Sequence, residues 1–370
     1  MARNGNTSSD LSSARTAKKD EFYTQYEDIE KEMNAYIEFN KDVFCNKIVL
    51  CPCDDPEWSN FTKYFAANFE RLGIKKLIST SYVKSAGSRQ LTLLEKDSQK
   101  YNEKKHDNNG KLFILDRDID GSGHIDSDDI QFEYLDGDGD FRSEEVSKLL
   151  EESDIVVTNP PFSLFRDFIK WIMNAKKKFI IIGNINCATY KEVFPLIKDN
   201  LIWLGATIHS GDRKFYVPDD YPLEAAGCGI DEEGKRFIRV KGVRWYTNID
   251  HEYRHEPLKL MTMNDNLKYN KKLLKKLLEK FSVSEYPYYD GYEAIEVPFT
   301  EAIPDDFTGI MGVPITFLDK YCPTQFTILG LDRYTMPKES LVGGRAAVNG
   351  KSGYARVLIK KISVGDVVNE

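Results

Sequence analysis

The sequence predicts an α/β fold with a mostly parallel, doubly wound sheet and an antiparallel hairpin at its edge. Segments with strand-like and helix-like spacing alternate up to about residue 255. One of them, Lys178–Gly183, has an apolar middle, as strands buried on both faces do. Beyond residue 255 a Lys-rich helix and strands punctuated by Pro and Gly follow, which predicts a smaller, β-rich C-terminal region.

Composition divides the 370 residues into three parts. Residues 1–19 are rich in Ser, Thr, Asn and Lys and are expected to form a disordered tail. We expect one large domain over residues 20–255, with a polar insertion at about 84–129. Residues 256–370 are expected to form a separate C-terminal region.

Charge and cysteine content limit the compartments and partners. No apolar run approaches the roughly 20 residues of a membrane span, and the N-terminus lacks a signal-peptide core, so a cytoplasmic protein without membrane contact is expected. The 6 cysteines are scattered, which favours reduced thiols. A net charge of −8 argues weakly against a nucleic-acid partner, but Lys-rich segments such as 271–276 leave that partner open.

Residues 20–82 alternate between helix and strand patterns. The elements expected there are helix Tyr26–Phe39, strand Ile48–Leu50, helix Asn60–Leu72 and strand Lys76–Tyr82. Thr24 is a candidate N-cap for the first helix and Ser59 for the second, which Gly73 closes as its C′ residue.

The strand-to-helix turn at Cys51–Phe61 is a candidate ligand site. Nucleotide-like cofactors bind at such turns because helix N–H groups and loop backbone converge there. The turn lacks glycine, so its side chains are expected to replace the close backbone contacts that glycine allows. These side chains belong to Asp54, Asp55, Ser59 and Asn60. A plain Asp-Pro turn capped by Ser59 is the alternative, and no acid ends strand 76–82 to bind a ribose.

Residues 118–129 follow the pattern of a calcium-binding loop. Asp118, Asp120 and Ser122 stand at positions one, three and five, and Gly123 stands at position six. Position twelve is Asp129 instead of the bidentate Glu, and no clear helix precedes the loop. Calcium binding and a solvated acidic hairpin therefore both stay open.

The remaining segments continue the alternation. The expected elements are helices Ser143–Glu152, Ser163–Ala175, Tyr190–Lys198 and Asn270–Phe281, strands Lys178–Gly183 and Leu201–Ile208, and a hairpin of Phe237–Val240 with Val243–Thr247. Acidic residues in the first turn favour the start of the helix at 143.

The Asn-Pro-Pro-Phe motif at 159–162 carries the most specific chemistry. The residues Ile155–Val157 before it are β-branched and predict a buried strand, and two prolines forbid both ladder pairing and helix entry. The strand therefore ends in a stiff extended turn. The Asn159 amide oxygen and the Pro160 carbonyl could both accept from an exocyclic amino group while Phe162 stacks on its ring, which suits adenine N6.

Five segments together resemble the EcoRI-type adenine-specific DNA methyltransferase family. They are Asp20–Gln25, Cys53–Phe61, Gly137–Phe141, Asn159–Phe162 and Gly312–Tyr321. The likeness covers roughly residues 20 to 360, although Gln25 stands where proline is usual and the second segment has lost its glycines. The resemblance implies a Rossmann-like S-adenosylmethionine methyltransferase sheet in residues 20–255 and DNA target recognition in residues 256–370.

The resemblance also implies a reaction, which is methylation of adenine N6 at a base flipped out of double-stranded DNA. S-adenosyl-L-methionine is the implied cofactor, no metal is needed, and a cognate restriction endonuclease that acts separately is a possible partner. The implied catalytic residues are Asn159, Pro160, Pro161 and Phe162. The implied cofactor-binding residues are Tyr23, Thr24, Asp54, Asp55, Pro56, Ser59, Asn60, Asp140, Phe141 and Asn159.

Two other functions fit parts of the sequence. Asn-Pro-Pro-aromatic motifs also serve enzymes that methylate an RNA adenine or a protein glutamine amide. A catalytically inactive DNA-binding or calcium-responsive module with a degenerate adenosyl fold is the alternative from another class, because the glycines and the ribose-binding acid are missing.

Overall fold

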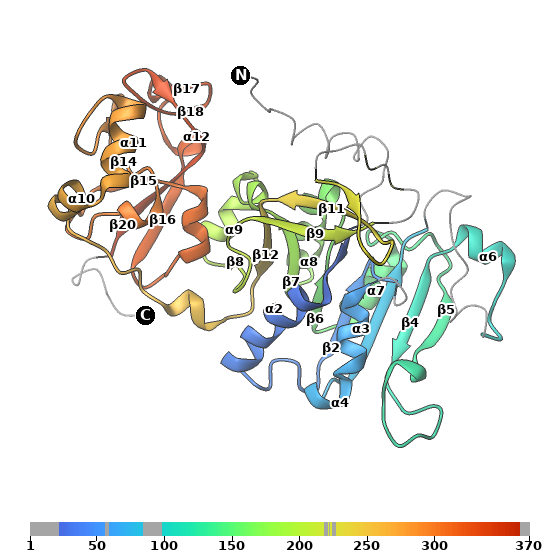
Figure 1. Ribbon diagram of the computed structural model, residues 1–370. Helices are drawn as coiled ribbons and strands as arrows, with labels where there is room; N and C mark the ends of the chain where they lie inside the picture. Colours follow the sequence, from blue (N-terminus) through green and yellow to red (C-terminus); the bar gives the residue numbers. More distant parts are fainter. Residues whose placement is uncertain are drawn as a thin grey trace. The chain divides into compact units, whose positions relative to one another are not determined.

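The structure is a computed structural model that describes residues 22–55, 59–83, 98–217, 221, 223 and 227–362 (Figure 1). Two compact units divide the chain, one over residues 1–184 and 210–250 and the other over residues 185–209 and 251–370. The tail expected at residues 1–19 lies outside the described ranges. Within those ranges, no helix combines the length and the apolar character needed to span a bilayer.

The central sheet of the first unit has the strand order β5-β4-β3-β2-β6-β7-β12. These strands are β2 Ile48–Pro52, β3 Lys76–Ser81, β4 Lys111–Leu115, β5 Gln131–Tyr134, β6 Ile155–Thr158, β7 Lys178–Asn184 and β12 Val243–Thr247. The pairs β3-β2, β2-β6 and β6-β7 are parallel, and the outer pairs β5-β4, β4-β3 and β7-β12 are antiparallel. A mixed α/β class is confirmed. The sheet is less parallel than expected, because β4 and β5, which were not predicted, add two antiparallel pairs to it.

Two of the crossovers between parallel strands run through helices, in opposite directions along the sheet. The helices of this unit are α2 Tyr26–Phe39, α3 Asn60–Ala67, α4 Phe69–Leu72, α6 Glu103–Asn108, α7 Glu144–Glu152 and α8 Phe165–Asn174, with short 3-10 turns η1 Ser127–Asp129 and η2 Phe162–Leu164. The chain crosses from β2 to β3 through α3 and from β6 to β7 through α8. Right-handed crossovers in opposite directions place these two helices on opposite faces, so the topology switches between β2 and β6.

Two local predictions near the start of this unit are wrong. The helix expected over Asn60–Leu72 breaks at Asn68, whose side-chain Nδ2 donates to Tyr64 O at 2.8 Å and competes with the helical pattern. Thr24 is not the N-cap of α2, because Gln25 takes that position without a side-chain hydrogen bond. Ser59 does cap α3, with its side chain accepting from Phe61 N at 3.1 Å.

A second, antiparallel sheet in this unit has the order β1-β9-β11-β10. Its strands are β1 Tyr23–Thr24, β9 Asp212–Tyr216, β10 Gly229–Ile230 and β11 Arg236–Lys241. The predicted hairpin of Phe237–Val240 with Val243–Thr247 is therefore wrong, since β11 pairs with β9 whereas β12 pairs with β7. Every residue of β12 is buried, while exposed residues alternate in the second half of β11, so only β12 suits the interior of the central sheet.

The second unit contains a sheet in the order β13-β14-β15-β20-β16 and a small sheet β17-β18-β19. Its strands are β8 Trp203–Leu204, β13 Tyr288–Tyr289, β14 Tyr292–Glu296, β15 Ile310–Pro314, β16 Phe326–Leu331, β17 Leu341–Val342, β18 Arg345–Val348, β19 Lys351–Ser352 and β20 Arg356–Lys361. Its helices are α9 Phe194–Lys198, α10 Met263–Tyr269, α11 Lys271–Phe281 and α12 Asp332–Thr335, and its 3-10 turns are η3 Ile185–Thr189, η4 Glu252–His255, η5 Thr300–Ala302, η6 Ile315–Lys320 and η7 Lys338–Ser340.

Two predicted elements of the second unit are shorter than expected. The helix expected over Tyr190–Lys198 begins only at Phe194, because Pro195 is tolerated in a first helical turn but not in a helix interior. The strand expected over Leu201–Ile208 is reduced to β8.

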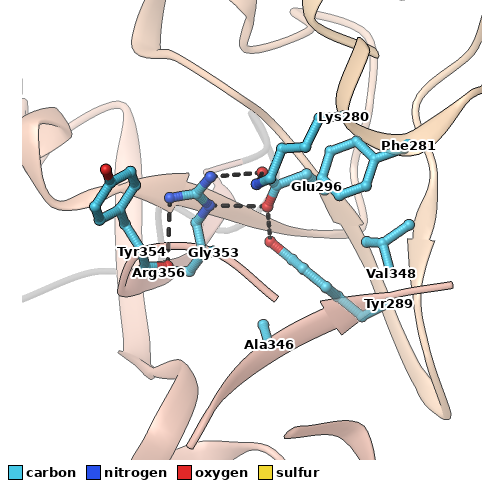
Figure 2. A pocket seen from close by; sticks show the side chains of 9 residues that line it. All are labelled: Lys280, Phe281, Tyr289, Glu296, Ala346, Val348, Gly353, Tyr354 and Arg356. Atoms are coloured by element: carbon cyan, nitrogen blue, oxygen red, sulfur yellow. Dashed lines mark hydrogen bonds and ion pairs between the residues drawn. The ribbon is translucent and has the colours of Figure 1, made fainter. Parts of the chain in front are cut away.

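A buried ion pair stabilises the second unit (Figure 2). Arg356 donates to both carboxylate oxygens of Glu296, at 2.6 and 2.8 Å, and Tyr289 also donates to that carboxylate. Glu296 is 2% exposed and Arg356 5% exposed. Burial raises the pKa of Glu296, but the hydrogen bonds and charge of Arg356, together with Lys280 and Tyr289, hold the pKa below its usual range. Both charges are therefore present and depend on each other.

We expect Arg356→Ala to destabilise the second unit by about 3–5 kcal/mol, because it leaves a buried carboxylate without its bidentate partner. Denaturant unfolding of the intact chain, combined with hydrogen exchange of the β14 and β20 amides, measures the loss. Lys360→Ala, an exposed position of the same strand, is the control and should change the stability little. A loss at Arg356→Ala below about 1 kcal/mol would contradict this account.

Candidate active site

The Asn159 side chain lies at the carboxyl end of β6, beside the topological switch. All four residues of β6 are buried, and the two prolines that follow end the strand. Asn159 Nδ2 donates to Phe22 O at 2.6 Å. Because a carbonyl can only accept, this bond determines which end of the amide faces it. Asn159 Oδ1 is buried and makes no hydrogen bond within the described residues, so it is available to a donor on a ligand.

Residues 22–25, whose Phe22 carbonyl accepts the hydrogen bond from Asn159, carry two further polar atoms without partners among the described residues. Thr24 Oγ1 and Gln25 Nε2 are buried and make no hydrogen bond to any described residue. Each such atom costs about 1–3 kcal/mol when nothing satisfies it. Strand β1 itself is well anchored, with Tyr23 opposite Tyr216 and Thr24 opposite Phe215. A fixed strand that presents unsatisfied polar atoms fits a polar ligand.

Aromatic rings surround the motif. The Phe162 ring centroid lies 5.6 Å from that of Phe22 and 6.4 Å from that of Phe215, both in edge-to-face arrangements. The Tyr221 ring lies 6.1 Å from Phe22. Phe162 is only half-buried, so part of its ring stays accessible. Offset and edge-to-face packing of this kind holds a ring in place while leaving a surface for another ring.

The loop after β2 is tied to β6 by hydrogen bonds to Asp54. Its Oδ1 accepts from Ser59 Oγ at 2.5 Å, and its Oδ2 lies within hydrogen-bonding distance of Thr158 Oγ1. Asp54 is 5% exposed, and burial raises its pKa to about 7 against the opposing effect of its hydrogen bonds with Ser59 and Thr158. The loop and the residue before Asn159 are thus joined through one buried carboxyl group.

Two further contacts fix the same loop. Asn60 Nδ2 donates to Thr24 O at 2.6 Å and so connects the start of α3 to β1. Asp55 lies 3.8 Å from the amine of Lys111, a β4 residue that is fully buried. A buried lysine needs a counter-charge, and Asp55 supplies one. Pro56 lies outside the described residues.

Asp140 and Phe141 lie in the loop before α7. Gly139 brings this loop against the end of β3, since a Cβ there would lie 2.3 Å from Ser81 O. Arg142 donates to the Asp140 carboxylate and holds its pKa below the usual range. Phe141 is buried, with its ring 4.9 Å from that of Phe168 in α8. The carboxylate therefore stays at the carboxyl edge of the sheet, while the ring packs into the core.

The structure joins most of the predicted residues through direct contacts. Those in contact around β1, β2 and β6 are Tyr23, Thr24, Asp54, Ser59, Asn60, Asn159 and Phe162. Pro160 and Pro161 join Asn159 to Phe162 in the chain, and Asp55 contacts Lys111 of β4. Sequence reasoning missed Phe22, Thr158, Phe215 and Lys111 as parts of the site. Only Lys111 gave a signal in the sequence, because a lone lysine at the start of the apolar run 111–115 indicates a charged side chain that needs a partner.

The loop at residues 118–129 gathers three carboxylates. One oxygen each from Asp118, Asp120 and Asp129 lies within 4.8 Å of the others. Asp129 also accepts from the backbone N–H groups of Ile119, at 2.6 Å, and Asp126, at 3.1 Å. The carboxylate at position twelve thus closes the loop through backbone hydrogen bonds, and both alternatives for this loop, calcium binding and a solvated acidic hairpin, stay hypotheses.

Comparison with known proteins relates the whole chain to one family. The family model described as "Adenine-specific methyltransferase EcoRI" matches residues 10–362. The Type II methyltransferase M.EcoRI of Escherichia coli is 43% identical over 97% of this chain and 98% of its own length. The Type II methyltransferases M.MgeORF184P of Mycoplasma genitalium and M.MpnI of Mycoplasma pneumoniae are each 32% identical over 94% of this chain and 97% of theirs. No solved structure matches the chain significantly.

The raised pKa of Asp54 predicts a pH-dependent stability. A carboxyl group in the unfolded chain has a pKa of about 4, whereas that of folded Asp54 is about 7. The contribution of Asp54 to the free energy of unfolding is therefore largest below about pH 4 and falls as the pH rises to about 7, because only the unfolded chain loses the proton in that interval.

Asp54→Asn removes this titration while keeping the shape of the side chain. We expect the variant to gain stability relative to the wild type across that interval, by on the order of a few kcal/mol. Urea unfolding of both proteins at several pH values between about 4 and 8 measures the difference. Parallel pH profiles for the two proteins would show that Asp54 ionises normally.

Proposed function

The chain belongs to the EcoRI adenine-specific methyltransferase family and is a DNA methyltransferase of the restriction-modification type, and from this membership we propose how its site works. The proposed reaction is transfer of a methyl group from S-adenosylmethionine to N6 of an adenine flipped out of duplex DNA. The observation that carries the proposal is the buried, unpartnered Oδ1 of Asn159 at the carboxyl end of β6.

Asn159 Oδ1 accepts a hydrogen bond from the adenine amino group. The lone pair of that nitrogen is delocalised into the ring and is a poor nucleophile. When Asn159 Oδ1 and the Pro160 carbonyl both accept from it, the nitrogen moves toward the tetrahedral geometry in which the lone pair can form a bond. This stabilises the transition state through acceptors that are already in place. The bond from Asn159 Nδ2 to Phe22 O keeps the oxygen pointed at the base.

Phe162 stacks on the flipped base. Extrusion of a base costs a few kcal/mol for unpairing and unstacking. The half-buried Phe162 ring is already held in place by edge-to-face contacts with Phe22 and Phe215. Stacking on this ring therefore offsets part of the cost of extrusion, and no mobile side chain has to be ordered first. Pro161 is the N-cap of the 3-10 turn that begins at Phe162, so the prolines set the position of the ring as well as the end of the strand.

The residues at the switch between β2 and β6 fit S-adenosylmethionine, in a sheet that we propose is of the Rossmann-like methyltransferase type. Bound there, the cofactor supplies an electrophilic methyl group. The unpartnered Thr24 Oγ1 offers a hydrogen bond to its polar end, and Tyr23, Asp55, Asn60, Asp140 and Phe141 are the other proposed binding residues. Asp54 and Ser59 bind each other and shape the loop.

We propose that residues 20–255 form the catalytic domain and that the C-terminal region recognises the DNA target. Helix α11 presents Lys271, Lys272, Lys275 and Lys276 on its exposed side. Lysines in this density suit the phosphates of a duplex. A DNA substrate places the enzyme in the cytoplasm, and a separately acting restriction endonuclease is the proposed functional counterpart.

We expect Asn159→Ala to reduce methyl transfer by at least 100-fold, because it removes the acceptor that acts in the transition state. Binding of S-adenosylmethionine should change little. Transfer of labelled methyl groups to DNA, with RNA and protein substrates in parallel, measures the activity, and calorimetry measures the binding. Asn174→Ala, an exposed position in α8, is the control. Wild-type rates in Asn159→Ala would contradict the mechanism.

Replacement of Lys271 and Lys275 by alanine tests the role of α11. We expect weaker DNA binding for every sequence, and a slope of log K against log salt that is smaller by about 2. The control is the double variant Lys41→Ala/Lys104→Ala, which removes two exposed lysines from the first unit. Equal salt slopes for the two double variants would exclude α11 as a phosphate contact.

A further inference from the structure

The hydrogen bonds around Thr158 require one more proton than an ionised Asp54 allows. Thr158 Oγ1 lies 2.5 Å from Pro52 O and also within hydrogen-bonding distance of Asp54 Oδ2. A hydroxyl carries one proton, and both Pro52 O and a carboxylate are acceptors only. One of the two short contacts would then lack a hydrogen.

A proton on Asp54 completes the chain. Thr158 Oγ1 is close enough to donate to either Asp54 Oδ2 or Pro52 O. With a proton on Asp54, Oδ2 can donate to Thr158 Oγ1, and the hydroxyl hydrogen of Thr158 is left for Pro52 O. Ser59 Oγ donates to the other oxygen, Oδ1. In the same cluster, Ser79 Oγ donates to the backbone carbonyl of Asp54 and accepts from Thr62 Oγ1. Every polar atom named then has a suitable partner, as buried groups require.

We propose that Asp54 is a positioning residue that acts as a neutral carboxylic acid, donating to Thr158 and thereby holding the neighbouring Asn159 in its productive position. The proposal rests on the function assigned above to Asn159. When the proton leaves to solvent, Thr158 has to turn its single hydrogen to the carboxylate, and Pro52 O loses its donor. The end of β6 then loses the hydrogen bond between Thr158 and Pro52 of β2. Methyl transfer slows as a result, while the sheet stays folded.

The surroundings of Asp54 favour the neutral form. Its neighbours on β3 and β6, Ser79 and Thr158, are hydroxyl groups without charge. Cys51 on β2 is a buried thiol whose pKa is raised by burial and by Asp54 itself. The charged groups nearby in the described residues are Asp55 and, beyond it, Lys111 of β4. Burial is the largest effect and brings the ionisation close to neutral pH.

Single-turnover methyl transfer at saturating cofactor and DNA tests the proposal. The wild-type rate should fall as the pH rises through the pKa of about 7 and should level off at the lower rate of the ionised form. Asp54→Asn keeps a donor and an acceptor and cannot ionise, so its rate should stay level over the same range. Affinity for S-adenosylmethionine should change less than about threefold in either protein, because the effect lies on the Asn159 amide, which accepts from the base and not from the cofactor.

Variants of Thr158 separate the hydrogen bond from packing. Thr158→Val should lower the rate at every pH and remove the alkaline decline, whereas Thr158→Ser, which keeps the hydroxyl, should restore both. A wild-type rate that is level across neutral pH, or an alkaline decline of equal size in Asp54→Asn, would overturn the proposal.

Infrared difference spectra of the wild-type protein provide a reading that needs no catalysis and no folded variant of Asp54. A protonated carboxyl C=O band that disappears as the pH passes through neutrality is expected. Absence of this band at acidic pH would refute the neutral acid even if Asn159 proves essential. Presence of the band with an active Asn159→Ala would refute the proposed function instead.

Discussion

The hydrogen bond from Asn159 Nδ2 to Phe22 O is the contact on which the site depends. It decides which end of the amide is left for a ligand, since the carbonyl of Phe22 accepts and cannot donate. It also attaches β6 of the central sheet to the segment that enters β1, and β1 pairs with β9 of the second sheet. Through Thr24 O and Asn60, the same segment reaches the loop after β2. One short stretch of backbone thus relates the Asn159 amide to the loop beside it.

The loop after β2 shows how such a turn can be built without glycine. Glycine-rich loops let backbone N–H groups approach a ligand closely. Here a buried carboxyl group, Asp54, organises the turn by joining Ser59 to Thr158, and the pair Asp55–Lys111 holds it from the side of β4. A loop supported by ionisable side chains responds to pH, whereas a loop supported by glycine backbone does not.

Local patterns were enough to predict part of the fold and the core of the site. The spacing of apolar residues predicted α2 and α8 closely, and the β-branched run before two prolines identified β6. The sequence did not reveal that β11 and β12 belong to different sheets, because strand partners depend on tertiary packing and not on local pattern. Phe22, Thr158 and Phe215 escaped notice for the same reason, since their roles arise from contacts over long separations in sequence.

The contact between Phe22 and Asn159 spans 137 positions of sequence. Pairing of β2 with β6 already joins distant parts of the chain, for example Val49 with Ile155, but it leaves the segment from Phe22 to the start of β2 to be ordered separately at an entropic cost. A chain in which β2, β3, β6 and β7 have already paired can therefore still lack a defined orientation of its Asn159 amide. On the mechanism proposed for Asn159, activity reports completion of the whole unit, and a partly folded molecule with an intact central sheet is inert toward DNA.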